Sequence, residues 1–462
     1  MGWYEHAFVY QVYPLGACGC AYEAPGEAER DGEASAHRIL RLASPAWVDH
    51  LKGLGVTCVM LNPVFASESH GYDTTDYAHV DPRLGTDADL ATLVSTLHAA
   101  GIRVMLDGVF NHVGRSFWAF ADVLENRRQS RYQDWFRISW DGDTGYHDGL
   151  WYDSWQGCEN LVRLNLENPE VRGYLLDVVR GWVRDFDIDG LRLDVAYCLD
   201  QRFLRDLRHL ADELTADPAR APLLVAPFSD DRTFTLMGET MFGDYNQWMG
   251  DDTCHSVTNY ECYKGLWSSM NSANMHEVAY AMNRQSGSDP WCLYTGRHLL
   301  DFLDNHDVTR IATQLDDKRR LTPLYGLLFG MPGVPCVYYG SEWGMEGEQR
   351  PYEHEIRPEV EAPEQTDLTR AIAAFAAARA RSEALCDGSY REVACQPLQL
   401  VFERAVDGER VLVAMNAADS TAHLDFDAGC GQAVDLVSGD IHDFGGGSDL
   451  PPFSCAYWRC ER

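Results

Sequence analysis

Eight short apolar runs, rich in β-branched and aromatic residues, recur along the first three quarters of the chain. They cover residues 8–14, 56–61, 102–112, 190–196, 233–239, 256–260, 299–307 and 333–340. Helical patterns lie between or after them at 44–54, 87–100, 168–186, 200–214 and 368–380. Strands that alternate with helices predict an α/β fold with a parallel sheet, and a (β/α)8 TIM barrel is the commonest such fold at this length.

The alternation breaks in two places. Residues 113–165 are rich in Trp, Tyr, Asp and Gly without a helical or strand period, and so many aromatic residues argue against disorder. Residues 385–462 show alternating strand-like runs separated by Asp-Gly and Gly-rich turns, which predict a small antiparallel domain. We therefore expect a barrel made of residues 1–112 and 166–384. A subdomain inserted over its mouth would comprise 113–165, and a C-terminal β-sandwich 385–462.

Composition narrows the choice of partners. The 462 residues include 38 basic and 71 acidic side chains, for a net charge of −33. This charge repels nucleic acid and anionic membrane surfaces, so we expect neither as a partner. The N-terminus lacks the basic and apolar regions of a signal peptide, and no apolar run is long enough to span a bilayer. A cytoplasmic location with reduced thiols is expected.

Three acidic residues end strand-like runs that are far apart in the sequence. Asp194, Glu239 and Asp307 follow the fourth, fifth and seventh runs, whose carboxyl ends would meet at one mouth of a barrel. Three carboxylates around one cavity cannot all ionise cheaply, so one pKa should rise. A protonated acid beside an ionised carboxylate, about 5 Å apart, is the pair that a retaining glycosidase uses.

Neighbouring residues suggest a role for each carboxylate. Arg192 lies two positions before Asp194 on the same strand face and would keep it ionised as a nucleophile. Glu239 follows an apolar strand, which suits an acid with a raised pKa. Asp307, beside His306, could stabilise positive charge on a sugar ring. Taken alone, Arg192 and Asp194 are more simply explained as a structural ion pair, but carboxylates at three strand ends have no folding reason to coincide.

These residues lie in tracts that resemble the four ordered sequence regions of the α-amylase family (glycoside hydrolase family 13). The tracts are Asp107–His112, Gly190–Asp194, Gly238–Glu239 and Phe302–Asp307. Secondary signatures of the family match at 71–72, 164–172 and 337–340. Within the family, the tracts at 130–136 and 186–196 look most like those of the neopullulanase and cyclomaltodextrinase group.

The resemblance implies a role for each matching residue. Asp194 would be the nucleophile, Glu239 the acid/base and Asp307 the stabiliser of the transition state. Sugar contacts at the cleavage site would come from Tyr72, His112, Arg192 and His306. Asp107 would belong to the same substrate-binding group as the partner of Arg192. Arg310 resembles a sugar-contacting arginine of the α-glucosidase branch, and a surface arginine that opens a helix is an equal alternative.

The resemblance also implies a reaction. It is hydrolysis of α-1,4, or additionally α-1,6, glucosidic bonds in maltooligosaccharides or related short glucans, with retention, through a covalent glucosyl-Asp intermediate. An alternative is a glucanotransferase or sugar phosphorylase that uses the same intermediate. A non-catalytic sugar-binding scaffold is a third alternative, disfavoured because all three carboxylates are present.

No cofactor and no metal site are expected. Asn111 lies where a calcium ligand often lies in the family, but Tyr197 and Cys198 replace the Lys-His pair that ends this region in secreted α-amylases. The neopullulanase group usually carries an extra N-terminal domain, whereas the first barrel strand here begins near Phe8. Its dimer architecture is therefore not assumed, and the oligomeric state stays open.

Overall fold

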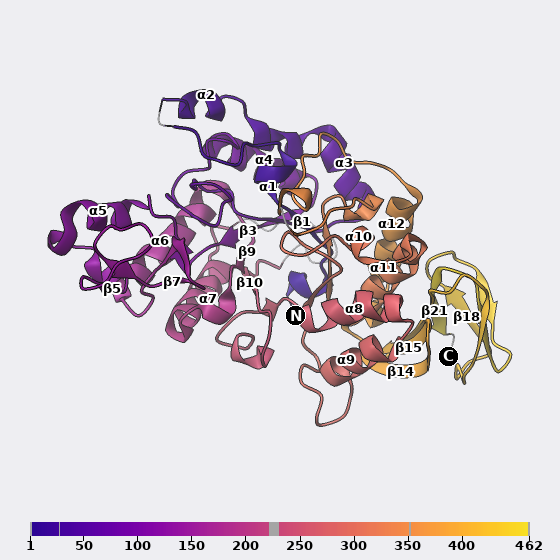
Figure 1. Ribbon diagram of the computed structural model, residues 1–462. Helices are drawn as coiled ribbons and strands as arrows, with labels where there is room; N and C mark the ends of the chain where they lie inside the picture. The colour runs from indigo at the N-terminus through magenta and orange to yellow at the C-terminus, as the bar shows by residue number, and fades with distance from the viewer. Residues whose placement is uncertain (1, 27, 221–230, 351–352, 461–462) are drawn as a thin grey trace.

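The computed structural model describes residues 2–26, 28–220, 231–350 and 353–460. Its centre is a sheet of eight parallel strands in the order β11-β10-β9-β3-β2-β1-β13-β12 (Figure 1). Their bounds are β1 (Val9–Val12), β2 (Cys58–Leu61), β3 (Arg103–Gly108), β9 (Gly190–Leu193), β10 (Thr235–Gly238), β11 (Ser256–Val257), β12 (Leu300–Phe302) and β13 (Val334–Tyr338). A bridge between Thr258 and Leu300 joins the two ends of the sheet. The sheet therefore closes into the predicted barrel.

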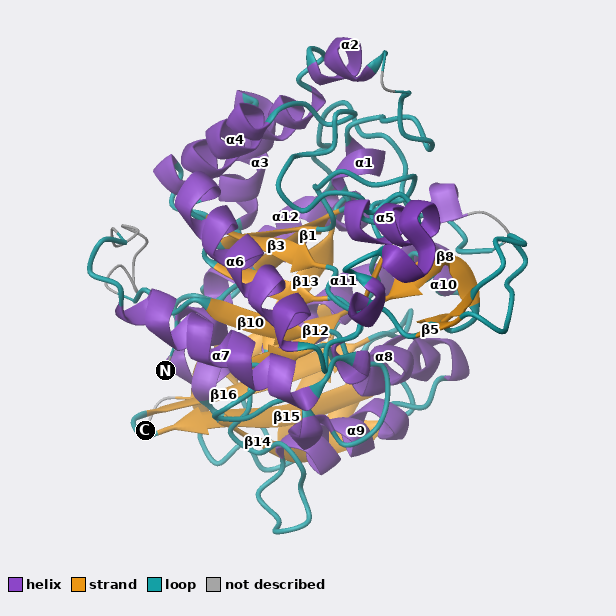
Figure 2. Cartoon of the chain, turned by 90° about the vertical axis from the view of Figure 1, so that its left-hand side faces the viewer, coloured by secondary structure: helices purple, strands orange, loops and turns teal. Residues whose placement is uncertain are grey.

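Helices cover the outside of the barrel (Figure 2). Helix α6 (Pro169–Phe186) illustrates how such a helix packs on the barrel, because its buried residues recur every three or four positions and form one apolar face. These residues are Val171, Leu175, Val179, Trp182, Val183 and Phe186. The longer helices are α3 (Pro45–Leu54), α4 (Asp87–Ala99), α6 (Pro169–Phe186), α7 (Gln201–Ala216), α8 (Tyr260–Ser272), α9 (His276–Ser286), α11 (Leu321–Gly330) and α12 (Asp367–Arg379). The shorter ones are α1 (Pro14–Ala17), α2 (Arg30–Ala34), α10 (Ile311–Gln314) and α13 (Glu383–Asp387).

The segment between β3 and α6 contains more regular structure than its sequence predicts. Its elements are β4 (His112–Val113), α5 (Trp118–Asn126), β5 (Ile138–Ser139), β6 (Trp151–Tyr152), β7 (Ser154–Trp155) and β8 (Cys158–Arg163). The expectation of a segment without a helical period is wrong, because α5 buries Ala119, Phe120 and Val123, a one-turn helical spacing. A stripe this short is easily hidden among the surrounding aromatic residues.

An antiparallel sheet follows α13, as predicted. Six strands are ordered β14-β15-β16-β21-β18-β19, and β17 pairs with β20. Their bounds are β14 (Ser389–Gln396), β15 (Gln399–Val406), β16 (Glu409–Asn416), β17 (Ala422–Asp425), β18 (Gln432–Asp435), β19 (Ile441–Asp443), β20 (Gly447–Leu450) and β21 (Ser454–Cys460). This sheet packs on α11, where the Tyr457 hydroxyl donates to the Gly326 carbonyl at 2.6 Å.

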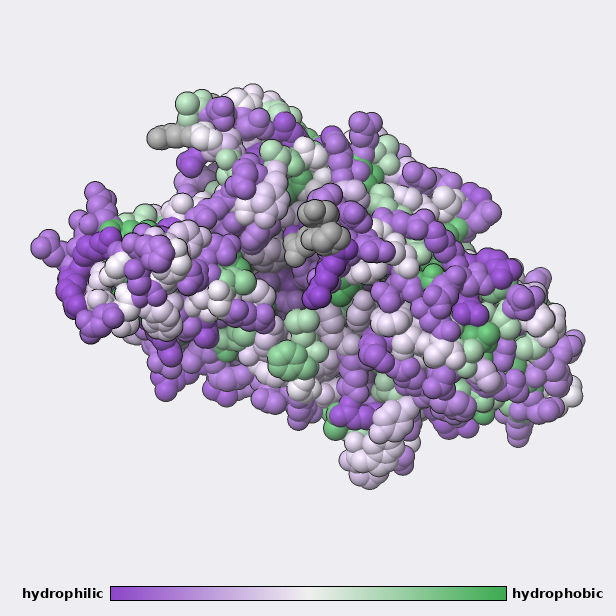
Figure 3. Space-filling view, in the orientation of Figure 1, coloured by the Kyte–Doolittle hydropathy of each residue, from purple (hydrophilic) through white to green (hydrophobic). Residues whose placement is uncertain are grey.

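The surface is mostly hydrophilic with scattered apolar patches (Figure 3), in keeping with the high net charge. Across the described ranges, no helix is both long and apolar enough to cross a membrane. The exact boundaries of the three expected parts stay predictions.

Candidate active site

A cavity of about 370 Å³ opens at the carboxyl ends of the barrel strands. The three predicted carboxylates, Asp194, Glu239 and Asp307, all line it. Its other lining residues come from the barrel loops and the inserted segment; they are Tyr22, His70, Tyr72, His112, Trp155, Cys158, Asn160, Leu161, Val195, Tyr197, Met241 and Arg357. Residues more than a hundred positions apart therefore share one cleft, as their places at strand ends predict.

The buried guanidinium of Arg192 joins three carboxylates at the base of this cavity. Its Nη1 lies 2.8 Å from Asp194 Oδ1 and 2.9 Å from Asp107 Oδ1, and its Nη2 lies 2.9 Å from Glu239 Oε2. The strand register explains the cluster, since Asp107 on β3 pairs directly with Arg192 on β9. Because one planar group contacts both, the bonded oxygens of Asp194 and Glu239 lie within about 8 Å of each other.

The backbone beside Asp194 orients Glu239. The amide N–H of Val195 donates to Glu239 Oε2 at 2.8 Å. Val195 has a φ of 39°, in the left-handed region that β-branched residues rarely adopt. Strain of this kind, at the residue after the expected nucleophile, is typical of functional sites.

A second cluster surrounds Asp307. His306 Nε2 lies 3.0 Å from Asp307 Oδ2, and Arg357 Nη2 lies 3.1 Å from Oδ1. The hydroxyl of Tyr72 hydrogen-bonds the same His306 nitrogen, and the two rings stack with centroids 5.6 Å apart. On the far side of the imidazole, Gln11 Nε2 lies 3.0 Å from Nδ1. The ring is therefore held at both nitrogens.

Burial and neighbouring charges set the pKa values of the carboxylates. Desolvation raises the pKa of Glu239, as expected. It also raises the pKa of Asp194, and the neighbouring Glu239 adds to this shift. Arg192 acts to lower the pKa of Asp194, as expected, but desolvation outweighs it, so the expectation of a low pKa is wrong. The pKa of Asp307 is lowered against its burial by His306 and Arg357.

His112 presents an uncharged imidazole to the cavity. Burial lowers the pKa of His112 to about 3. Its Nε2 lies 3.9 Å from Asp194 Oδ2, and neither atom has a hydrogen-bond partner among the described residues. The His112 ring also lies 5.6 Å from that of Trp155 on the inserted segment. Two unpaired polar atoms that face one cavity are available to a polar ligand.

Arg310 fits neither expectation. It is fully buried, so it is not a surface arginine, and it does not line the cavity. Its Nη1 donates to the Tyr339 carbonyl at 2.9 Å and its Nη2 to the Ile356 carbonyl at 2.9 Å. The guanidinium therefore hydrogen-bonds two loop segments to each other. These bonds to backbone carbonyls take the place of the expected sugar contact.

Of the site residues that sequence reasoning missed, three contact predicted ones directly. Arg357 lines the cavity but lies in an irregular segment outside every motif tract. Gln11 and Asn62 are buried and hydrogen-bond each other at 3.0 Å, and Asn62 also donates to Asp107 at 3.1 Å. A signal for both was present, since a lone amide within or just after an apolar barrel strand needs a polar partner.

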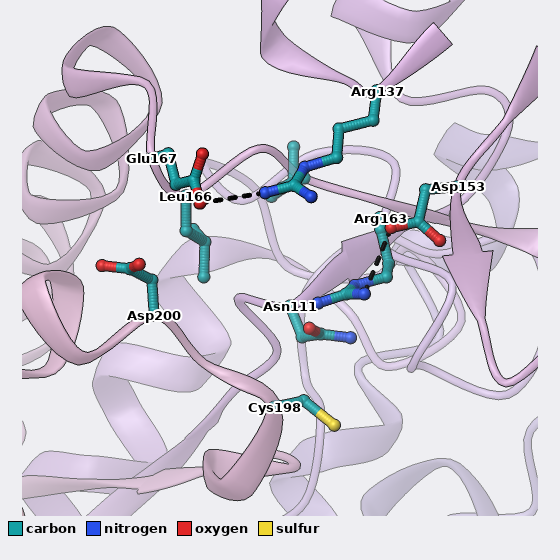
Figure 4. Close-up of a pocket in the computed structure, with 9 residues that line it drawn as sticks. Asn111, Arg137, Asp153, Arg163, Leu166, Glu167, Cys198 and Asp200 are labelled. Carbon is teal, nitrogen blue, oxygen red and sulfur yellow. Dashed lines mark hydrogen bonds and ion pairs between the residues drawn. The ribbon is translucent and has the colours of Figure 1, made fainter. Parts of the chain in front are cut away.

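A smaller cavity of about 190 Å³ lies beside Asn111 (Figure 4). Arg163 and Arg137 line it, paired at 3.1 Å with Asp153 and Glu167 respectively. Calcium prefers a cage of oxygen ligands, and two guanidinium groups do not fit beside a divalent cation. Among the described residues, no three His, Cys, Asp or Glu side chains are grouped to hold a metal ion.

Comparisons with known proteins agree on one family. The profile of the alpha amylase catalytic domain matches residues 46–384. A cyclomaltodextrinase of Geobacillus thermopakistaniensis (strain MAS1) is 32% identical over 399 residues, which cover 85% of this chain and 65% of that protein. An intracellular maltogenic amylase of Bacillus subtilis is 34% identical over 313 residues, which cover 66% of this chain and 48% of that protein. The chain thus spans less than two thirds of the length of these relatives.

A solved structure matches over its whole length. The cyclic α-maltosyl-(1→6)-maltose hydrolase from Arthrobacter globiformis, in complex with cyclic α-maltosyl-(1→6)-maltose, aligns with a TM-score of 0.79 at 26% identity. The alignment covers 99% of each chain. The barrel, the inserted segment and the C-terminal sheet therefore recur together in a protein of similar size.

Proposed function

The chain belongs to the α-amylase family, and from this premise we propose that it is a retaining α-glucoside hydrolase. Its substrates would be maltooligosaccharides or related short glucans, linear or cyclic, cleaved at α-1,4 and also α-1,6 linkages. The observation that carries the proposal is the Arg192 guanidinium shared by Asp194 and Glu239 at the base of an open cavity. Two carboxyl groups on one arginine, with a third carboxylate beside them, supply the groups that glycoside hydrolysis with retention needs.

In the first step, Asp194 Oδ2 attacks the anomeric carbon while Glu239 protonates the departing glycosidic oxygen. Asp194 is suited to this because Arg192 fixes its other oxygen at 2.8 Å and leaves Oδ2 without a partner among the described residues. The glucosyl-Asp194 ester is then hydrolysed by a water molecule that gives its proton to Glu239. Asp307, with its pKa lowered, stays ionised and stabilises the positive charge on the ring.

The relatives support the substrate class. Two are named as a cyclomaltodextrinase and a maltogenic amylase, and the Arthrobacter protein is named for a cyclic substrate with α-1,6 bonds. The ring of Tyr72, which lines the cavity, offers an apolar surface of the kind against which sugar rings pack. The Bacillus relative is named as intracellular, which supports a cytoplasmic location for this chain.

Transfer to a second sugar is an alternative outcome of the same intermediate, and one observation favours it. Met241 and Tyr197 line the cavity next to Glu239, and the exposed ring of Phe242 lies 5.2 Å from that of Tyr197. An apolar platform on the side of the acid/base would hold an acceptor sugar and compete with water.

Product analysis tests the proposal. The chain is incubated with maltotriose, pullulan, cyclodextrin and sucrose, with and without phosphate, and the anomer first released is read by proton NMR. We expect α-anomers from the glucans in both conditions. Asp194→Asn should lower kcat by about 10⁴-fold or more, whereas Asp252→Asn, at an exposed surface aspartate, should change nothing. Initial release of β-anomers, or an active Asp194→Asn variant, would contradict the proposal.

A further inference from the structure

One aromatic side chain lines the mouth of the catalytic cavity rather than its base. Tyr22, in the loop that follows β1 and α1, is 66% exposed and is the most exposed of the aromatic residues that line the cavity. Tyr72, by contrast, is 9% exposed, and Asp194 is 5% exposed. A glucose unit that reaches Asp194 at the base therefore lies below Tyr22, and the next unit of the chain lies level with it.

The backbone that carries Tyr22 is held in place by a buried ion pair. The buried guanidinium of Arg83 contacts both oxygens of Asp81, at 2.7 and 2.9 Å. Its Nη1 also donates to the carbonyls of Ala21 and Tyr22. Single exposed aromatic residues are common on protein surfaces, but here the hydrogen bonds fix the main chain that presents the ring to the cavity. Little conformational entropy is then lost when a ligand packs on the ring.

Tyr22 belongs to the wall of the barrel that faces the acid/base. In the closed order of the eight strands, β1 lies four places from β10 in either direction, so the two strands are opposite each other. Tyr22 follows β1, whereas Glu239 and Met241 follow β10. The N–H of Ala24 donates to the Glu68 carbonyl at 2.9 Å and joins the segment of Tyr22 to the loop after β2, the neighbour of β1.

This placement gives the substrate a direction across the cavity. Glu239 protonates the departing oxygen, so the leaving part of the chain extends towards the wall of Glu239 and Met241. The part that stays on Asp194 extends the other way, towards the wall of Tyr22. The aromatic ring at that rim therefore lies where the second glucose unit before the cleaved bond arrives.

From this arrangement we propose that Tyr22 determines chain-length specificity, because its ring holds the glucose unit that precedes the one being cleaved. The proposal rests on the proposed hydrolase function and assigns a role to a residue outside every motif tract of the sequence. Sugar rings present apolar C–H faces that pack on an aromatic ring. Chains with two or more units on this side of the cleaved bond should therefore be preferred over chains with one.

Two aryl glycosides with the same leaving group test this role. The α-glucoside of p-nitrophenol places one sugar unit before the cleaved bond and the α-maltoside places two, and initial rates of nitrophenol release report only cleavage of the aryl bond. We expect Tyr22→Ala to lower kcat/KM for the maltoside by roughly 5- to 10-fold and to leave the glucoside unchanged. Tyr22→Phe, which retains the ring, should behave like the wild type. Tyr280→Ala, at a tyrosine of similar exposure on α9, should change neither substrate.

The outcomes separate this role from the proposed function. A wild-type chain that releases nitrophenol from neither glycoside would contradict the hydrolase function, and the role of Tyr22 with it. If the wild type cleaves the maltoside, a Tyr22→Ala variant that keeps the wild-type ratio of the two kcat/KM values would overturn the role of Tyr22 and leave the hydrolase function intact. A Tyr22→Phe variant as impaired on the maltoside as Tyr22→Ala would also overturn it, since the ring would then not be what holds the sugar.

Discussion

At the scale of single residues, the site depends on how one cation is shared. Arg192 contacts Asp107, Asp194 and Glu239 at once, so none of the three carboxylates receives its full charge. Burial then raises the pKa of both Asp194 and Glu239. Two interacting carboxyl groups with raised pKa values titrate as a pair and hold one proton over a shared pH range. That single proton lets one member act as acid and the other as nucleophile.

The pH dependence of kcat/KM should reflect this pair. Activity falls at low pH when Asp194 is protonated, and at high pH when Glu239 loses its proton. Since both pKa values are raised, we expect the acid limb above 3.8 and the alkaline limb above 4.5, the ordinary values of the two groups. Initial rates on maltotriose measure both limbs. An acid limb below 3.8 would contradict this account; Glu239→Gln, assayed with glucosyl fluorides, should lose only the alkaline limb.

Arg357 should contribute to turnover through Asp307. Its guanidinium contacts Asp307 Oδ1 at 3.1 Å and the His306 carbonyl at 3.0 Å. Loss of a charged hydrogen bond costs about 1.5–3 kcal/mol, so Arg357→Met should lower kcat/KM by roughly 10- to 100-fold. Steady-state kinetics checks this. Arg205→Met, which removes an exposed partner of Asp252, is the matched control and should leave the kinetics unchanged.

The sequence places the three carboxylates in one cavity because each follows an apolar strand of a barrel. It could not give the sign of the Asp194 pKa shift, because that sign depends on how deeply the residue is buried and how many acids share Arg192. The expectations for Arg310 are wrong for a related reason. A basic residue in a loop is usually exposed, and only the fold shows the backbone carbonyls that surround it.

At the scale of elements, the barrel could be predicted because its strands are buried on both faces. β1, β2 and β3 are buried along their whole length and therefore form apolar runs. The predicted seventh strand is too long: β12 ends at Phe302, and the polar residues up to Asp307 form the loop that carries the site. Helix α5 escapes prediction because it contributes only one apolar turn.

The packing of the inserted segment on the barrel should be stable without calcium. Arg163 and Arg137 line the cavity beside Asn111 and are already paired with Asp153 and Glu167. We expect EDTA to leave both Tm and kcat unchanged, as measured by differential scanning fluorimetry and maltotriose turnover. Calcium-saturated EDTA at the same concentration controls for ionic strength. A Tm lowered by EDTA and restored by calcium would show that a metal stabilises the contact between the inserted segment and the barrel.

At the scale of the whole molecule, α11 connects the barrel to the C-terminal sheet. Tyr457 of β21 donates to the Gly326 carbonyl at 2.6 Å, and Arg404 of β15 donates to the Gly330 carbonyl at 3.0 Å. Two glycines on one helix let the sheet approach the helix backbone closely, so hydrogen bonds can form there. The sheet is thereby fixed to the outside of the barrel, away from the cavity.

Gly326→Ala should therefore destabilise the chain, although alanine is the better helix former. An added Cβ would lie 2.4 Å from Cys455 Cβ and 3.0 Å from Phe375 Cζ. Overpacking of this kind costs about 1–3 kcal/mol and exceeds the gain of about 0.5–1 kcal/mol from removing a helical glycine. Gly173→Ala in α6, where the new Cβ meets nothing within 4 Å, should give that gain alone. Calorimetry should thus show Tm shifts of opposite sign. Equal shifts in the two variants would mean that the sheet does not press on α11 as described.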